Sequence, residues 1–227
     1  MSVLTATDLV VKQGETLALD GLTLAVNQGE VVALIGHNGA GKSTFFKTVM
    51  GLIEPRGGIL ALAGETPPSV LYKQQVVYIP EQPFLLPELT VFQHFQLYLE
   101  SYNQYKDEKV NEIYDLANRF EIAGELDQFP LELSKGMKQK AQLIAGLIID
   151  APLLLIDEPF VGLDVYAQQE LTTVLKEKKQ AGQAIILTTH QFDQLSGIMD
   201  RYIMLHQGKL IKEGNQQDLG ELKRRFD

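Results

Sequence analysis

Short, continuous apolar runs alternate with amphipathic stretches along most of this chain. The continuous apolar runs are residues 31–35, 153–156 and 184–187. Runs of this kind are typical of central parallel strands that are covered on both faces. The stretches with the apolar spacing of a helix are residues 43–50, which end at Gly51, and residues 164–180 and 191–199. Because strand and helix patterns alternate, the sequence predicts an α/β fold with a mainly parallel sheet.

Two regions depart from this alternation. Residues 4–26 and 59–62 have the pattern of short strands with polar turns, which predicts an antiparallel β flank. Residues 90–120 have the pattern of consecutive helices, which predicts a helical subdomain inserted at about residues 84–135. The sequence shows no internal repeat, low-complexity tract or Ser/Gly linker, so residues 1–227 are expected to form a single domain.

The composition narrows the possible classes of function. The chain has 227 residues, of which 45% are hydrophobic, enough for a sizeable core. A formal net charge of −9 argues against a nucleic-acid partner, which requires a basic surface. The lack of cysteine excludes disulfides, zinc–thiolate sites and thiol catalysis. The first ten residues do not resemble a secretory signal, and the apolar runs are too short to cross a bilayer. We therefore expect contact with a membrane only through a partner protein.

A glycine-rich motif directly follows the first apolar run. It fits the pattern G-x-x-x-x-G-K-[ST] and consists of Gly36, His37, Asn38, Gly39, Ala40, Gly41, Lys42, Ser43 and Thr44. Its glycines let backbone N–H groups approach phosphate oxygens, and the helix that follows points its positive end at the same anion. Lys42 is expected to reach the β- and γ-phosphates, and the Ser43 hydroxyl to bind Mg²⁺. The alternative is a turn that matches by chance, but the strand–loop–helix context favours a nucleotide site.

Candidate catalytic side chains follow the two other apolar runs. Asp157 and Glu158 come directly after one run, and His190 lies shortly after the other. Strand ends often carry acidic turn residues, and a lone histidine is often only structural. In an open α/β sheet, however, the carboxyl ends of the strands meet at the ligand. We therefore expect Asp157 to hold Mg²⁺ through water, Glu158 to accept a proton from an attacking water, and His190 to contact the γ-phosphate.

In their order along the chain, these motifs resemble those of the ATP-binding subunits of ABC transporters, over nearly the whole length. Gln82, in the segment Tyr-Ile-Pro-Glu-Gln at residues 78–82, is similar to the family's Q-loop. Residues 133–139, Leu-Ser-Lys-Gly-Met-Lys-Gln, are similar to its LSGGQ signature, and residues 161–164, Val-Gly-Leu-Asp, to its D-loop. The phosphate loop and the signature together make the resemblance specific.

The resemblance implies that two subunits bind two ATP molecules, each between the phosphate loop of one subunit and the signature of the other. The catalytic residues that it implies are Lys42, Gln82, Glu158 and His190. The implied Mg²⁺ ligands are Ser43, Gln82 and Asp157, and further nucleotide contacts are implied for Ser134, Gly136 and Asp164. The implied partners are transmembrane permease subunits and an identical or different ATPase subunit, at the cytoplasmic face of the cell membrane. Ser134 is also expected to cap the helical run at residues 137–149.

The sequence departs from the family pattern in two places. In the signature, Lys135 stands where the family pattern has Gly, and Met137 stands where it has Gln. A signature with Lys in that place resembles exporter-type subunits and favours export over import. No aromatic residue precedes Phe45, so Val11 or Gln13 is left to contact adenine, if any residue does. In the apolar segment 83–87, we expect one or two of Phe84, Leu85 and Leu86 to be exposed and to contact a helix of the membrane partner.

Two other functions compete with a transporter motor. The first is an ABC ATPase that acts on DNA ends or ribosomes. Members that act on DNA ends carry a long coiled coil between the phosphate loop and the signature, and the stretch between Lys42 and Leu133 is too short for one. Members that act on ribosomes usually hold two ATPase units in one chain, and this sequence holds one. The second is a catalytically inactive binding or regulatory subunit, against which the intact Lys42, Glu158 and His190 argue. The sequence therefore favours an ATPase that drives transport.

Overall fold

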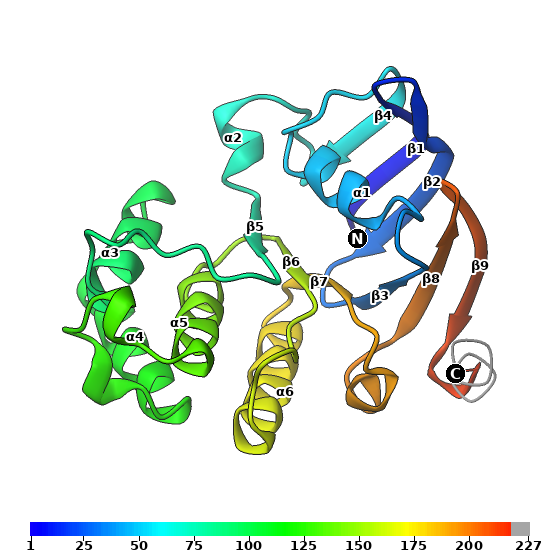
Figure 1. The fold of residues 1–227 in the computed structure, drawn as a ribbon. Coiled ribbons are helices and arrows are strands. Elements are labelled where there is room, and N and C mark those ends of the chain that lie inside the picture. Colours follow the sequence, from blue (N-terminus) through cyan, green and yellow to red (C-terminus); the bar gives the residue numbers. More distant parts are fainter. Residues whose placement is uncertain (219–227) are drawn as a thin grey trace.

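The computed structural model describes residues 1–218, and only the backbone of residues 192 and 193. It contains a six-stranded and a three-stranded sheet with helices beside them (Figure 1). The strands are β1 (Ser2–Gln13), β2 (Thr16–Asn27), β3 (Val31–Ile35), β4 (Gly57–Leu62), β5 (Val76–Ile79), β6 (Leu153–Asp157), β7 (Ala184–Thr188), β8 (Arg201–His206) and β9 (Lys209–Asn215). The α-helices are α1 (Lys42–Val49), α2 (Val70–Lys73), α3 (Val91–Ser101), α4 (Asp107–Arg119), α5 (Lys135–Leu147) and α6 (Val165–Gln180). Short 3₁₀ segments span Ala123–Glu125, Pro130–Glu132, Phe192–Leu195 and Gln216–Asp218.

The larger sheet has the strand order β5-β6-β7-β3-β8-β9. Its neighbouring strands run parallel, except that β9 pairs antiparallel with β8. Alternate residues of the central strands face two different cores. In β3, Val31, Ala33 and Ile35 pack in one core, whereas Val32 and Leu34 pack in the other. Because both faces are covered, these strands are apolar without interruption. The predicted α/β fold with a mainly parallel sheet is confirmed.

The smaller sheet confirms the predicted antiparallel β flank. Its order is β2-β1-β4, and both pairings are antiparallel. Together with α1 it covers one face of the larger sheet. The strands β1 and β2 have 12 residues each, longer than the short strands that the sequence predicts. Irregular pairing between them, including a positive φ of 47° at Asp8, divides the pattern and explains that difference.

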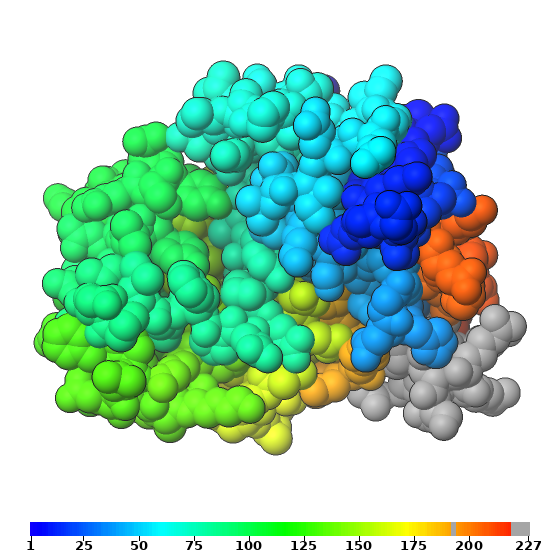
Figure 2. Space-filling model, turned by 45° about the horizontal axis from the view of Figure 1, so that its top comes forward, coloured from blue at the N-terminus to red at the C-terminus, as the bar shows by residue number. Residues whose placement is uncertain are grey.

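Helices α3, α4 and α5 lie together on the other side of the molecule, away from the β1–β2–β4 sheet (Figure 1). Their apolar faces pack with α6 in the core that also contains Val31, Ala33 and Ile35 of β3. Examples are Phe95, Ile113 and Leu143. The space-filling view shows this helical part and the N-terminal strands at opposite ends of one face, with the segment that follows β5 between them (Figure 2). Helices α3 and α4 are the two consecutive helices that the sequence predicts at residues 90–120.

The predicted helix at residues 191–199 is wrong. The chain forms only a 3₁₀ segment, Phe192–Leu195, followed by a turn in which Gly197 has a φ of 83°. The apolar spacing in this stretch nevertheless marks buried side chains, since Leu195, Ile198 and Met199 lie in the core. Within the described part of the chain, no helix combines the length and hydrophobicity that crossing a membrane requires.

Candidate functional site

The phosphate-loop motif joins β3 to α1 and forms one wall of an open cavity of about 750 Å³. Residues 37–44 all line this cavity, whereas Gly36 lies behind it. Helix α1 begins directly after Gly41, which has a φ of 110°. A Cβ atom there would lie 2.8 Å from the carbonyl oxygen of Ala18 in β2, so the close approach of β2 requires glycine. The free N–H groups at the start of α1 face an anion in such a loop.

Lys42 is the first residue of α1, and its side chain turns back along the loop. Its ammonium donates a hydrogen bond to the carbonyl oxygen of Gly36. Burial lowers the pKa of the Lys42 ammonium, and the negative charges of Glu158 and Asp157 oppose this effect. The amine is therefore partly desolvated and lies near two carboxylates. The negative charge of a bound polyphosphate stabilises the ammonium form further.

Asp157 ends β6, and hydroxyl groups hold both of its carboxylate oxygens. The Thr188 hydroxyl donates to Oδ1 from the neighbouring strand β7. The Tyr78 hydroxyl, from β5, donates to Oδ2 over 3.4 Å. Burial and the nearby Asp157 carboxylate raise the pKa of the Tyr78 hydroxyl, which keeps it a hydrogen-bond donor. The carboxylate thus lies in the cavity wall with a fixed orientation.

Glu158 follows Asp157 directly and lines the same cavity. Its side chain is mostly buried, with 10% of its surface exposed. One carboxylate oxygen accepts a hydrogen bond of 3.1 Å from the backbone N–H of His190, and the other lies 3.4 Å from Nε2 of the His190 ring. Burial raises the pKa of the Glu158 carboxyl, the contacts with His190 lower it, and the nearby Asp157 and Glu81 carboxylates raise it further, so that the net shift is upward. A carboxyl with a raised pKa is a stronger base than an exposed glutamate.

The cavity wall after β5 contains Glu81, which directly precedes the Gln82 that the resemblance implies as a Mg²⁺ ligand. Glu81 lines the cavity and lies close enough to Glu158 to influence its pKa. Gln82 is exposed and does not line the cavity. The two polar residues are adjacent in the sequence, and the direction in which β5 ends decides which of them faces the phosphate loop. No local pattern in the sequence distinguishes these two adjacent polar positions.

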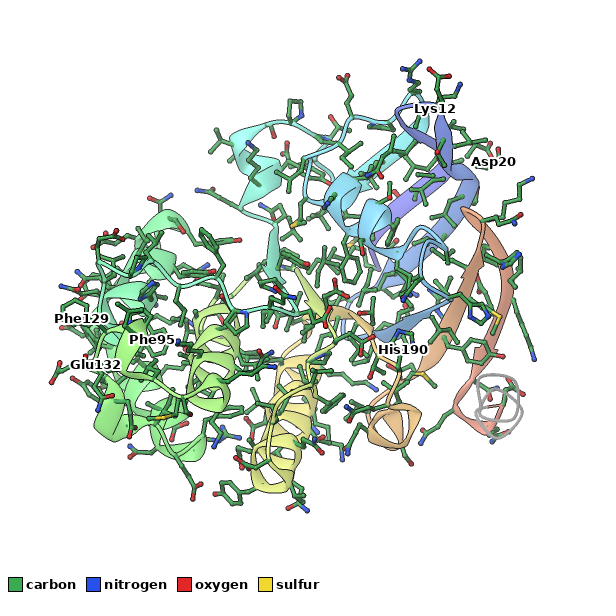
Figure 3. All side chains as sticks on the ribbon, viewed as in Figure 1. Lys12, Asp20, Phe95, Phe129, Glu132 and His190 are labelled. Carbon is green, nitrogen blue, oxygen red and sulfur yellow. The ribbon has the colours of Figure 1, made fainter. Side chains whose placement is uncertain are left out.

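The signature residues do not contribute to this cavity. Ser134 caps α5, its hydroxyl accepting the N–H of Met137 over 3.2 Å, as the sequence predicts, although α5 starts at Lys135 and not at residue 137. Neither Ser134, Gly136 nor Asp164 lines the cavity. Figure 3 shows Phe129 and Glu132, just before the signature, at the outer edge of the helical part, whereas His190 lies in the central part of the molecule.

Asp164 and the signature helix contact each other within the chain. Asp164 caps α6 by accepting the N–H of Ala167 over 2.8 Å, and its carboxylate pairs with Lys140 of α5 at 2.9 Å. A Cβ atom on Gly136 would lie 3.7 Å from the carbonyl oxygen of Gly162. The signature and the D-loop segment therefore contact each other within the chain, and Val161, the first residue of that segment, lines the phosphate-loop cavity.

The far wall of the cavity is aliphatic and polar. It is formed by Gln13, Thr16, Leu17 and Ala18, at the turn between β1 and β2. Of the two residues that the sequence leaves to contact the base, Gln13 lines the cavity, whereas Val11 is fully buried and does not. Leu17, which is 38% exposed, is an apolar candidate that the sequence argument missed.

The oxygen atoms in the cavity suit Mg²⁺. This ion prefers hard oxygen ligands, keeps several waters and in phosphate sites needs only one or two carboxylates. The Ser43 hydroxyl and the oriented Asp157 carboxylate both line the cavity, and Glu81 adds a second carboxylate. Among the described residues, no group of three or more His, Cys, Asp or Glu side chains is arranged to hold a metal by itself. The site therefore fits an ion that arrives with a nucleotide.

The other histidines are outside this arrangement or at its edge. His94 is buried, with one ring nitrogen 2.8 Å from the carbonyl oxygen of Thr90 and the other accepting the N–H of Leu86 over 2.7 Å. Both ring nitrogens of His94 are thus used in local structure. His37 lines the cavity within the phosphate loop, whereas His206 ends β8 and does not line the cavity.

Known proteins are similar to this chain in both sequence and fold. Residues 19–161 match the family model described as ABC transporter. The chain is 34% identical over 225 residues to the ABC-type transporter ATP-binding protein EcsA of Bacillus subtilis, covering 97% of this chain and 90% of EcsA. It is 33% identical over 195 residues to the SkfA peptide export ATP-binding protein SkfE of Bacillus subtilis, covering 86% and 82% of the two chains. A solved ATP-binding subunit of an ABC transporter superposes with a TM-score of 0.91 and 36% identity, covering 99% of this chain and 93% of that one. The chain therefore belongs to the ABC transporter family, in which it is an ATP-binding subunit whose ATPase activity drives transport.

Proposed function

We propose that the cavity beside the phosphate loop binds Mg²⁺-ATP and is the site of its hydrolysis. Lys42 and the N–H groups at the start of α1 hold the phosphates, and Ser43 and Asp157 hold the ion. When bound, Mg²⁺ neutralises charge on the β- and γ-phosphates. The observation that carries this proposal is the convergence on one cavity of the phosphate loop, the Asp157–Glu158 strand end and His190.

In this proposal Glu158 is the general base. Its raised pKa and its orientation by the His190 N–H support the role, since a base must hold its carboxylate toward the water that it deprotonates. His190 keeps its ring beside Glu158 with 57% of the side chain exposed, so it also has access to a γ-phosphate in the cavity. Glu81 takes the position at the metal that the sequence assigns to Gln82.

We further propose that the site is completed by a second subunit. Ser134 and Gly136 lie at the start of α5, where free N–H groups favour an anion, yet they lie outside the cavity of their own chain. Two copies related by a twofold axis bring each signature onto the other copy's phosphate loop. The surface shared by the signature and Asp164 then faces the partner's nucleotide.

The membrane partner is proposed to contact the segment after β5. Phe84 is 72% exposed, whereas Leu85 and Leu86 are partly buried. The backbone of this segment is anchored to the helical part, since the Phe84 N–H donates to the Gln142 side chain over 2.9 Å. An exposed aromatic ring on an anchored backbone suits a docking contact. The similar protein cbiO1 from Clostridium perfringens, at 25% identity and a TM-score of 0.80, is part of the ABC transporter complex cbiONQ.

Export is the proposed direction of transport. Lys135 in the signature is the exporter-like feature of the sequence. Two relatives carry export in their names, SkfE of Bacillus subtilis and the Nod factor export ATP-binding protein I of Burkholderia orbicola, which is 31% identical over 205 residues.

Complementation between two inactive variants tests the shared site. Lys42→Ala destroys the phosphate loop, and Ser134→Arg blocks the signature. Each variant by itself is expected to be inactive, because both sites of its dimer are damaged. In a mixture, half of the dimers are mixed and each has one intact site, so turnover should return to about one quarter of the wild-type value. If the mixture stays inactive although Glu158→Gln forms dimers with ATP, the phosphate loop and the signature do not share a site.

A further inference from the structure

Thr188 connects the two neighbouring acidic residues of the site. It is the last residue of β7, lies opposite Asp157 in the parallel register and is fully buried. Its hydroxyl donates a hydrogen bond to Oδ1 of Asp157 and accepts the backbone N–H of Glu158 over 3.1 Å. One buried oxygen atom is thus bonded both to the carboxylate of Asp157 and to the backbone of Glu158.

The backbone at Glu158 needs such support. Its φ of 48° lies in the left-handed region, which residues with a Cβ atom seldom adopt. Backbone of this kind persists where the surroundings hold it in place. Here the Glu158 N–H is held by the hydroxyl of Thr188 and, over 3.2 Å, by its carbonyl oxygen. Two residues further along, His190 holds the Glu158 carboxylate. The end of β7 therefore fixes both the backbone and the side chain of Glu158.

We propose that Thr188 is a positioning residue for ATP hydrolysis, whose hydroxyl fixes Asp157 and Glu158 relative to each other. The inference rests on the proposed roles of these two residues at the metal and at the attacking water. Without the hydroxyl, Oδ1 of Asp157 loses its donor, and only the longer contact from Tyr78 remains on the other oxygen. The Glu158 N–H keeps the Thr188 carbonyl oxygen and loses the hydroxyl.

The matched variants are Thr188→Val, which keeps the shape and removes the hydroxyl, and Thr188→Ser, which keeps the hydroxyl. Thr172→Val is the control, since the Thr172 hydroxyl donates to the carbonyl oxygen of Gln168 within α6 and lies outside the cavity. A small displacement of catalytic groups costs up to about 100-fold in rate. We expect Thr188→Val to lower kcat about 10- to 100-fold, with KM for ATP changed less than about threefold. Thr188→Ser should stay within about threefold of wild type in both.

A second measurement does not depend on turnover. Binding of Mn²⁺ in the presence of a non-hydrolysable ATP analogue, followed by electron paramagnetic resonance, should be about 10-fold weaker in Thr188→Val and unchanged in Thr188→Ser and Thr172→Val. Unchanged kcat and unchanged Mn²⁺ binding in Thr188→Val overturn the inference. So does a Thr188→Val protein that melts far below wild type, because the hydroxyl then serves the stability of the fold. If the proposed function itself is wrong, Glu158→Gln keeps its turnover; if only this inference is wrong, Glu158→Gln loses turnover and Thr188→Val does not.

Discussion

The backbone N–H of His190 donates a hydrogen bond of 3.1 Å to the carboxylate of Glu158, and the His190 ring lies 3.4 Å from the other oxygen of the same group. The two residues come from the ends of β7 and β6, which are neighbours in the sheet. A histidine and a glutamate 32 residues apart therefore meet at the cavity through strand pairing and not through local sequence. This contact places the proposed base where a bound nucleotide is attacked.

Glu158→Gln should abolish most turnover while leaving ATP binding intact. Glutamine keeps the size of the side chain but does not accept the proton, and loss of a general base costs about 10²- to 10⁴-fold. Steady-state phosphate release measures the change, and Glu88→Gln, at an exposed position outside the cavity, is the control. Phosphate release within threefold of wild type would contradict the assignment of Glu158.

Lys42→Ala should weaken binding as well as turnover. In the proposed site its ammonium binds the β- and γ-phosphates, and its removal costs charge-assisted hydrogen bonds in both the bound and the transition state. We expect affinity for a fluorescent ATP analogue to fall at least about tenfold, or about 1.4 kcal/mol. Lys47→Ala, on the exposed side of α1, serves as the control. Unchanged affinity together with unchanged turnover would remove Lys42 from the site.

Single substitutions of Glu81 and Gln82 should show which of the two residues binds the metal. Both residues are exposed, but Glu81 lines the cavity near Glu158 and Gln82 does not. Glu81→Ala is expected to raise the Mg²⁺ concentration for half-maximal ATPase activity about tenfold, as loss of a carboxylate near a metal does elsewhere. Gln82→Ala should change it less than about twofold. The opposite ranking of the two variants would return the metal role to Gln82.

Phe84→Ser should impair assembly with the membrane subunits and spare the ATPase site. The Phe84 ring is 72% exposed and does not line the nucleotide cavity. We expect at least about a fivefold loss of membrane subunits copurified from detergent-solubilised membranes, with nucleotide affinity unchanged, because hot-spot aromatic residues carry about 2 kcal/mol or more of binding energy. Ile211→Ser, at a 55% exposed position on β9, is the control. Equal recovery of membrane subunits by the two variants would place the docking surface elsewhere.

ATP and GTP should bind with similar affinity. Stacking of a base on an aromatic side chain contributes about 1–3 kcal/mol, and the cavity wall between β1 and β2 offers Gln13, Thr16 and Leu17 in place of an aromatic ring. Most of the affinity then comes from the triphosphate, which is the same in both nucleotides. Competition binding should give apparent affinities within about tenfold, or about 1.4 kcal/mol. A hundredfold preference for ATP would mean that another group reads the base.

The parts of the fold that the sequence predicts are those with a local signal. The buried strands β3, β6 and β7 have unbroken apolar runs, since each is covered on both faces. The predicted helix cap Ser134 acts within three residues of its own position. The strands β5, β8 and β9 have no counterpart among the predicted elements. β9 lies at the edge of the sheet, and its residues alternate between exposed and partly buried. Its hydrophobic pattern therefore gives only a weak strand signal.

The misassigned helix at residues 191–199 has a different cause. Leu195, Ile198 and Met199 are buried as a helical pattern requires, yet Gly197 takes a left-handed conformation that ends the segment after one turn. Apolar spacing reports which side chains are buried but not whether the backbone between them is helical. Packing against the core satisfies the same residues in a short 3₁₀ segment.

The sequence by itself determined the phosphate loop, the acidic strand end and the order of the motifs, because each depends on residues that are adjacent in the chain. Only the tertiary structure decided that Glu81 and not Gln82 faces the cavity, that Val11 is buried, and that Thr188 joins Asp157 to Glu158 across 31 residues. These relations arise from strand register and from the direction in which each strand ends. Both are fixed by pairing between distant segments and by burial on two faces, and neither leaves a local mark in the sequence.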